Sequence, residues 1–195
     1  MKKIMFNDIY GLTDAVLEGR KTMTRRIVPG GTPLGNWSET AKHSKDQQGE
    51  EVAVAQNYEQ AGWNPDTLQQ AFVKKPTIFP DLDEYKPLCG WVDLPLKYHK
   101  GWTNKMFVLN DLMPHRIRIT GIKLEWLQDI REEDCLREGI KKMEGGVPYR
   151  FEENGKIHLS ADPRMLFADL IDRISGRGTW NRNPLVYVYE FELVR

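Results

Sequence analysis

The sequence lacks the features that mark several large classes of protein. Its only cysteines, Cys89 and Cys135, are too few and too far apart for a disulfide framework or a zinc site. No apolar run approaches the roughly 20 residues that a membrane-spanning helix needs. The 28 basic side chains are balanced by 28 acidic ones, so the basic excess of a protein that binds nucleic acid over its whole surface is missing. We therefore expect a cytoplasmic protein with no membrane partner, in which any nucleic-acid contact comes from a local patch.

Signatures of metal and cofactor binding are also missing. The four histidines, His43, His99, His115 and His158, show no spacing typical of metal ligands, and no glycine-rich nucleotide loop leads from a strand into a helix. We therefore expect neither a metal nor a cofactor. With 40% hydrophobic residues the chain can bury a core, and its length suits a single domain over residues 1–195.

Apolar periodicity and capping residues predict three helices. The first spans 7–19 and ends at Gly19, where a left-handed residue is wanted. The second runs from about 130 to 138 and is closed by Gly139. The third opens at Asp162 and Pro163 and ends at Gly176, with one apolar stripe along its length. Between the last two helices, residues 141–160 are predicted to form a hairpin-like excursion.

Alternating apolar residues predict strands over 51–55, 106–109, 115–125 and 185–194. Within 115–125 the apolar set changes phase at Gly121, as at a β-bulge. We interpret the stripe Tyr187, Tyr189 and Phe191 as core rather than a stacking platform. Strands at intervals with short helices between them predict an α+β fold, a small mixed or antiparallel β-barrel with helices on its rim.

Prolines alternate with aromatic residues over 57–104. A stretch this long without regular structure is unusual in a compact domain. Its indoles make it too apolar for a free linker. We therefore expect an ordered insertion that packs on the barrel through Trp63, Trp91 and Trp102.

The segment after Gly19 combines cationic and hydroxyl side chains within seven residues. A hydroxyl nucleophile needs a nearby base, which a lysine can be if burial lowers its pKa. Arginines can hold a phosphate or a developing oxyanion. Composition alone favours the simpler interpretation of a solvated basic turn. The side chains in question are Arg20, Lys21, Thr22, Thr24, Arg25 and Arg26.

Two other places are candidates for a site. Glu138 stands at the C-terminal end of a predicted helix, where a carboxylate is electrostatically unfavourable, whereas the acids at 132–134 complement the helix dipole and need no function. The loop 176–184 offers the indole of Trp180 for stacking and the guanidinium groups of Arg177 and Arg182 for phosphates. The alternative for this loop is a helix stop whose tryptophan plugs one end of the barrel.

These segments together resemble a known family. Residues 17–26 resemble the GRKT-x-T-x-R signature of the ASCH family, which belongs to the PUA-like barrel superfamily. Residues 116–120 leading into 127–140 are similar to the middle of that family. Residues 180–191 resemble the W-x-x-NP-x-V-x-V-x-x-F close of its longer branch, found in phages and mobile elements.

The resemblance implies a small barrel with a cleft that takes RNA or a modified nucleoside. Small bacterial members remove the acetyl group from N4-acetylcytidine with a lysine, a threonine and a glutamate, which map by motif position to Lys21, Thr24 and Glu138. The resemblance implies Thr24 as nucleophile or as the group that orients a water, Lys21 as its base, and Glu138 as the group that shuttles a proton to the leaving amine. Substrate contacts are expected from Arg20, Arg25, Arg26, Arg177, Trp180 and Arg182.

Three functions stay open at this point. The first is hydrolysis of an N4-acylated cytidine or a related modified-nucleoside amide. The second is a non-catalytic RNA-binding module in the same cleft. The third is a phage-type accessory protein that serves as a scaffold. The balanced charge weakens the second, because phosphate neutralisation supplies most sequence-independent affinity for RNA. The oligomeric state stays undetermined.

Overall fold

The computed structural model describes residues 1–74, 100–145 and 148–194. The chain divides into two compact units. The larger comprises Phe6–Val52 and His115–Arg195, and the smaller comprises Met1–Met5 and Ala53–Pro114. The smaller unit contains the expected insertion, of which the part around Trp91 lies outside the described residues.

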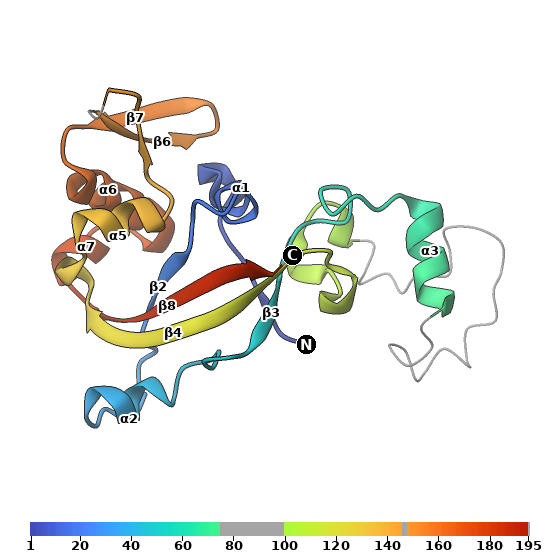
Figure 1. Ribbon diagram of the computed structural model, residues 1–195, viewed down its shortest axis with the longest axis horizontal. Coiled ribbons are helices and arrows are strands. Elements are labelled where there is room, and N and C mark those ends of the chain that lie inside the picture. Colours follow the sequence, from blue (N-terminus) through green and yellow to red (C-terminus); the bar gives the residue numbers. More distant parts are fainter. Residues whose placement is uncertain (75–99, 146–147, 195) are drawn as a thin grey trace. The chain divides into compact units, whose positions relative to one another are not determined.

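The main sheet of the larger unit is built around its last strand. Strand β8 (Leu185–Val194) pairs antiparallel with β2 (Met23–Ile27) on one side and β4 (Arg116–Trp126) on the other (Figure 1). The β4–β8 register shifts between Ile119 and Gly121, which confirms the predicted bulge. Beyond β4, the amide of Gly49 and the carbonyl of Glu50 bond to the backbone of Ile119, just before β3 (Glu51–Val54) begins.

Both faces of this sheet are covered. Helices α5 (Glu132–Arg137), α6 (Pro163–Ser175) and α7 (Thr179–Arg182) lie over one face, and α2 (Trp37–Ala41) lies over the other (Figure 1). Successive side chains of β8 point to opposite faces of the sheet, so they are covered alternately by the helices of one face and of the other. The valines at 186 and 188 and the tyrosines at 187 and 189 are all buried, which confirms that the tyrosine stripe belongs to the core.

The first predicted helix is divided in two. A 3-10 turn η1 (Asp8–Tyr10) precedes α1 (Leu12–Leu17), because Gly11 between them has a positive φ of 61°. Gly19 follows α1 with a φ of 74°, which confirms its expected left-handed conformation. The other two predicted helices are found as α5 and α6, and a short turn η8 (Leu127–Asp129) connects β4 to α5.

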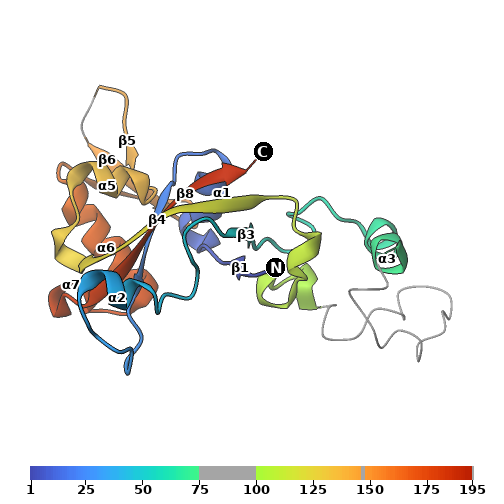
Figure 2. The same ribbon diagram turned by 60° about the horizontal axis from the view of Figure 1, so that its bottom comes forward.

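A second, three-stranded sheet fills the hairpin region of the larger unit. Its strands are β5 (Lys141–Lys142), β6 (Tyr149–Glu153) and β7 (Lys156–Ser160), in that order. Asn154 and Gly155 form the β6–β7 turn with φ values of 47° and 82°, which a two-residue hairpin with positive φ at both central positions requires. This sheet lies near α6 (Figure 2), and the predicted hairpin is confirmed.

The described residues of the smaller unit form short strands, one helix and several 3-10 turns. Strand β1 (Lys3–Ile4) pairs in parallel with the end of β3, and α3 (Pro65–Lys74) follows. The strand predicted over 106–109 is wrong. Three 3-10 turns occupy this region, because the Asn104 side chain caps the amide of Met106 and no face of the segment is consistently buried. The turns are η5 (Lys100–Trp102), η6 (Lys105–Phe107) and η7 (Asn110–Leu112).

Aromatic side chains form the core of the smaller unit. Tyr58 is fully buried, and its ring meets that of Trp102 edge-on at 5.6 Å. The indole nitrogen of Trp63 donates to the carbonyl of Leu112 at 2.8 Å. Both tryptophans pack against a buried cluster that includes Tyr58 and Leu68. The described part of the insertion is thus packed, whereas its packing on the barrel stays a prediction.

The α+β class is confirmed. In the part of the chain that the structure describes, β4, β8 and β2 follow one another in an open order and no strands close into a barrel. Within the same residues, no helix has the length and apolar character to cross a membrane.

Because β8 is bonded on both sides, a cavity in its centre should be costly. Val188 is fully buried, so we expect Val188→Ala to lower the free energy of unfolding by about 2 kcal/mol. Glu192→Ala, an exposed change on the same strand, should cost less than about 1 kcal/mol, since exposed ion pairs contribute little. Urea denaturation of both variants measures the difference. Equal losses would contradict the central position of Val188.

Candidate functional site

The central feature of the larger unit's interior is an ion pair between Lys21 and Glu138. The Lys21 ammonium donates to the Glu138 carboxylate at 2.6 Å and to its carbonyl oxygen at 2.7 Å. Lys21 precedes β2, and Glu138 is the C-cap residue of α5. Their exposed fractions are 2% and 4%, so the pair is removed from water.

Backbone contacts hold these two residues in place. The amide of Lys21 donates to the carbonyl of Ala15, and the amide of Thr22 donates to the carbonyl of Arg137 at 3.0 Å. Gly139 follows Glu138 with a φ of 114°. A Cβ atom there would lie 2.9 Å from Leu12 and 3.7 Å from the stem of Lys21, so both conformation and space favour glycine.

The second oxygen of Glu138 is bound by Arg25. The Arg25 Nη1 to Glu138 Oε1 distance is 3.1 Å, and the same guanidinium bonds Glu125 through Nε at 2.9 Å and contacts Asp134 at 3.3 Å. Its side chain is 1% exposed. A cation that is buried among three carboxylates has no donor directed to a ligand, so the expected substrate contact of Arg25 is not supported. Arg25 instead fixes the position of Glu138.

The environment of Lys21 lowers the pKa of its amine. Burial is the largest cause, because it penalises the charged form, and the nearby guanidinium groups of Arg26 and Arg25 act in the same direction. The Glu138 carboxylate opposes this shift without cancelling it. A lysine with a lowered pKa has more of the neutral amine near neutral pH, which is the form that accepts a proton.

Thr24 and Arg26 lie on the opposite face of β2 from Arg25. Thr24 is directly opposite Tyr189 in the β2–β8 register, and its buried hydroxyl has no hydrogen-bond partner among the described residues. Arg26 is exposed, with its guanidinium 5.9 Å from the centre of the Phe6 ring. The Lys21 ammonium lies 5.8 Å from the same ring. Phe6 therefore places Lys21 beside the face that bears Thr24 and Arg26.

The remaining predicted residues lie elsewhere in the larger unit. Arg20 pairs with Glu18, and both line a pocket beside α1. The carboxylate of Asp172 accepts from the amides of Gly178 and Trp180 and so fixes the loop after α6, where Arg177 and Arg182 are exposed. The Trp180 indole is half-buried and meets the Phe167 ring edge-on at 6.3 Å, so it packs against α6.

The structure thus brings Lys21, Glu138, Arg25 and Arg26 together and places Thr24 on the face of Arg26. Sequence reasoning missed Phe6 and Glu125 and assigned Asp134 to the helix dipole alone. Arg25 is opposite Val188 and Glu125 is opposite Val186, two residues away along β8, so both lie on one face, a relation that needs the strand order. In the described residues, no group of three or more His, Cys, Asp or Glu side chains is placed to hold a metal ion.

Comparison with protein-family models, with curated proteins and with solved structures finds no match for this chain. The resemblance to the ASCH family therefore rests on the motifs in residues 17–26, 116–140 and 180–191. Every functional assignment that follows from it is a proposal.

Glu138 should be essential for stability because it is shared by two buried cations. In Glu138→Gln the amide has one oxygen, so either Lys21 or Arg25 must face an NH2 group. We expect the free energy of unfolding to fall by about 3 kcal/mol, as when one partner of a buried ion pair is removed. Asp134→Asn weakens the 3.3 Å contact with Arg25 and the 3.5 Å contact with Arg137, both at a partly exposed carboxylate, and should cost about 1 kcal/mol or less. Urea denaturation distinguishes the two, and a Glu138→Gln protein as stable as the parent would contradict the shared role.

The neighbouring thiol offers a chemical probe of this interior. Burial raises the pKa of Cys135 on α5 from its ordinary value near 9 to about 12. In a Cys89→Ser variant, we expect iodoacetamide at pH 8.5 to leave the folded protein unmodified and to react once urea unfolds it. The raised pKa also means that this group's contribution to stability is present below pH 9 and is lost as the pH rises from 9 toward 12. Rapid alkylation of the folded protein would contradict the burial of α5.

Proposed function

We propose that this protein hydrolyses an N4-acylated cytidine or a related modified-nucleoside amide. The observation that supports this most is the buried pair of Lys21 and Glu138, 2.6 Å apart, in which the pKa of the lysine is lowered. Amide cleavage needs a base that is partly neutral near pH 7 and an acid that delivers a proton to the departing amine. The Thr24 hydroxyl, which has no hydrogen-bond partner among the described residues, lies on β2, three residues after the lysine.

The proposed reaction begins when the neutral amine of Lys21 takes the hydroxyl proton of Thr24. The Thr24 oxygen then bonds to the acyl carbon, and Arg26 stabilises the oxyanion that forms. The bond from that carbon to N4 of cytidine breaks, and the proton reaches the leaving amine from Lys21 through Glu138. Water then gives a proton to Lys21 and attacks the acyl carbon. The bond from that carbon to the Thr24 oxygen breaks, Lys21 returns the proton to Thr24, and the acyl group leaves as a carboxylic acid. In the alternative form, Thr24 orients a water that attacks directly.

Arg25 has a positioning role in this proposal. It binds Oε1 of Glu138 and leaves Oε2 for Lys21. Its other bonds, to Glu125 on β4 and Asp134 on α5, fix it from two elements. The carboxylate is therefore presented to the lysine in one orientation, which proton transfer between the two groups requires.

We also propose that the whole chain is a single ASCH-type, PUA-like domain with the 57–104 segment as its insertion. The antiparallel β2–β8–β4 arrangement, which places the GRKT segment beside the closing strand, supports this relation. A closed barrel and a cleft for RNA or a nucleoside are parts of the proposal.

Turnover of N4-acetylcytidine tests the catalytic assignment. We expect Lys21→Met to reduce kcat/KM by at least about a hundredfold, since general base catalysis contributes that much. Thr24→Ala should have a similar effect, and Thr24→Ser should keep part of the activity because it retains the hydroxyl. The matched control is Thr22→Ala, because the Thr22 hydroxyl is bonded to Arg137 and has no proposed role.

The outcomes separate the three functions. Absence of turnover by the parent protein with several N4-acylated cytidines, together with nanomolar RNA affinity at physiological salt, would replace the hydrolase by the RNA-binding module. Absence of both activities would favour a scaffold role. Turnover that survives Lys21→Met in a folded protein would leave the substrate class standing and refute the role of the lysine.

A further inference from the structure

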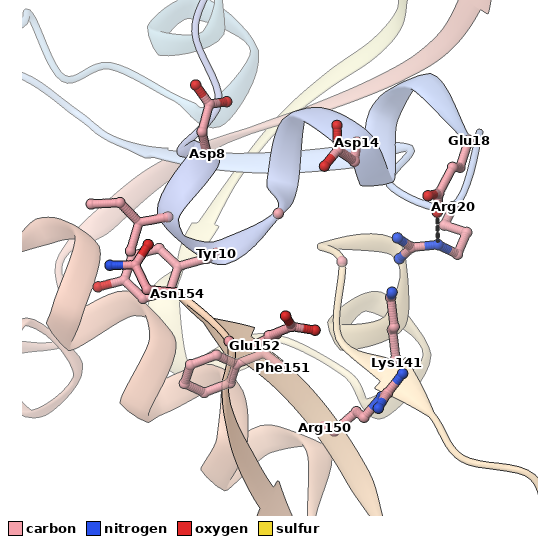
Figure 3. A pocket seen from close by; sticks show the side chains of 14 residues that line it. Asp8, Tyr10, Asp14, Glu18, Arg20, Lys141, Arg150, Phe151, Glu152 and Asn154 are labelled. Atoms are coloured by element: carbon pink, nitrogen blue, oxygen red, sulfur yellow. Dashed lines mark hydrogen bonds and ion pairs between the residues drawn. The ribbon is translucent and has the colours of Figure 1, made fainter.

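A pocket of about 250 Å³ lies between α1, with its preceding turn η1, and the β5–β6 edge of the second sheet (Figure 3). None of Lys21, Thr24 and Glu138 lines it. The pocket is therefore separate from the proposed catalytic group, and binding there can be measured without turnover.

One end of this pocket gathers three cationic side chains, of which Arg20 is paired with Glu18. Lys141 and Arg150 are directly opposite each other in the β5–β6 register, and both are half-buried. Neither has a carboxylate partner among the described residues. Like charges at opposed positions of two strands destabilise a sheet. Arg20 lines the same end from the α1 side (Figure 3).

Carboxylates line the pocket as well, and one of them, Glu18, lies beside Arg20. Glu18 is paired with Arg20, and Asp8 accepts the hydroxyl of Thr13, so these two carboxylates are engaged. Asp14 on α1 and Glu152 on β6 are exposed and have no partner in the part of the chain that the structure describes. The pocket therefore presents unneutralised cations at one end and free hydrogen-bond acceptors beside them.

We propose that this pocket binds a small phosphomonoester that also carries hydroxyl groups, such as a sugar phosphate. A phosphate monoester carries close to two negative charges at pH 7, which matches the two unpaired cations, and it accepts the paired donors of a guanidinium. Its hydroxyls donate to Asp14 and Glu152, as carboxylates bind ribose hydroxyls in other nucleotide sites. Binding relieves the repulsion between Lys141 and Arg150.

Isothermal titration calorimetry with three probes tests the proposal: ribose 5-phosphate, inorganic phosphate and ribose. Ribose 5-phosphate should bind tightest, inorganic phosphate more weakly, and ribose not measurably. Lys141→Met and Arg150→Met should each weaken both phosphate probes by about tenfold or more, the loss of a charge-assisted hydrogen bond. The matched control is Lys142→Met, because Lys142 is the neighbouring lysine of the same strand, is exposed and does not line the pocket.

The acidic side is tested by Asp14→Asn. This change should weaken ribose 5-phosphate and leave inorganic phosphate unchanged or slightly tighter, since a nearby negative charge is removed. Should a variant fail to fold, the parent protein still provides a test. Its affinity for ribose 5-phosphate should fall from pH 7.5 to pH 5.5 as the phosphate loses its second charge near pH 6.

Three results would overturn the proposal. One is the absence of phosphate binding by the folded parent protein. Another is an equal loss of affinity in Lys141→Met and Lys142→Met. The third is ribose affinity equal to that of ribose 5-phosphate.

Discussion

The shared carboxylate of Glu138 is the interaction on which the interior of the larger unit depends. One oxygen faces Lys21 and the other faces Arg25, so a single residue at the end of α5 bridges two cations from the β2 segment. Each of the three groups loses hydration on burial, and their mutual contacts, together with those of Arg25 to Glu125 and Asp134, compensate for that loss. The end of α5 and the start of β2 therefore depend on each other for the burial of their charges.

Alternation along β2 then decides what each residue of the motif can do. Successive side chains of a strand point to opposite faces, so Arg25 lies under α5 while Thr24 and Arg26 face the side of α2 and Phe6. The arginine that is buried among carboxylates acts on the geometry of Glu138. Arg26 and Thr24, on the opposite face, are the groups that the proposed reaction assigns to the substrate. Arg25 and Arg26 are adjacent and of the same residue type, but they lie on opposite faces of β2 and therefore have different roles.

The sequence predicts well where a pattern is long and regular. The period of α6, the alternation of β8 and the phase change at Gly121 extend over enough residues to define their elements. The apolar run 106–109 is too short for this, and a local cap from Asn104 decides its conformation. Within the site, Glu138 is predictable because it opposes the helix dipole. The contacts of Arg25 with Glu125 and Asp134 are not, because they depend on which strands and helices become neighbours.

The larger unit contains two groups of charges that differ in one physical respect. Around Glu138 each buried cation has a carboxylate within hydrogen-bonding distance, so the group is satisfied by the protein itself. In the pocket beside α1, Lys141 and Arg150 oppose each other with no carboxylate partner in the described part of the chain, although carboxylates line the same cavity. Burial lowers the pKa of the Lys21 amine, and the Glu138 carboxylate holds that amine in one orientation. Lys141 and Arg150 are half-buried cations at opposed positions of a small sheet, and an anion bound between them would reduce their repulsion. The first group is therefore suited to proton transfer and the second to binding an anion.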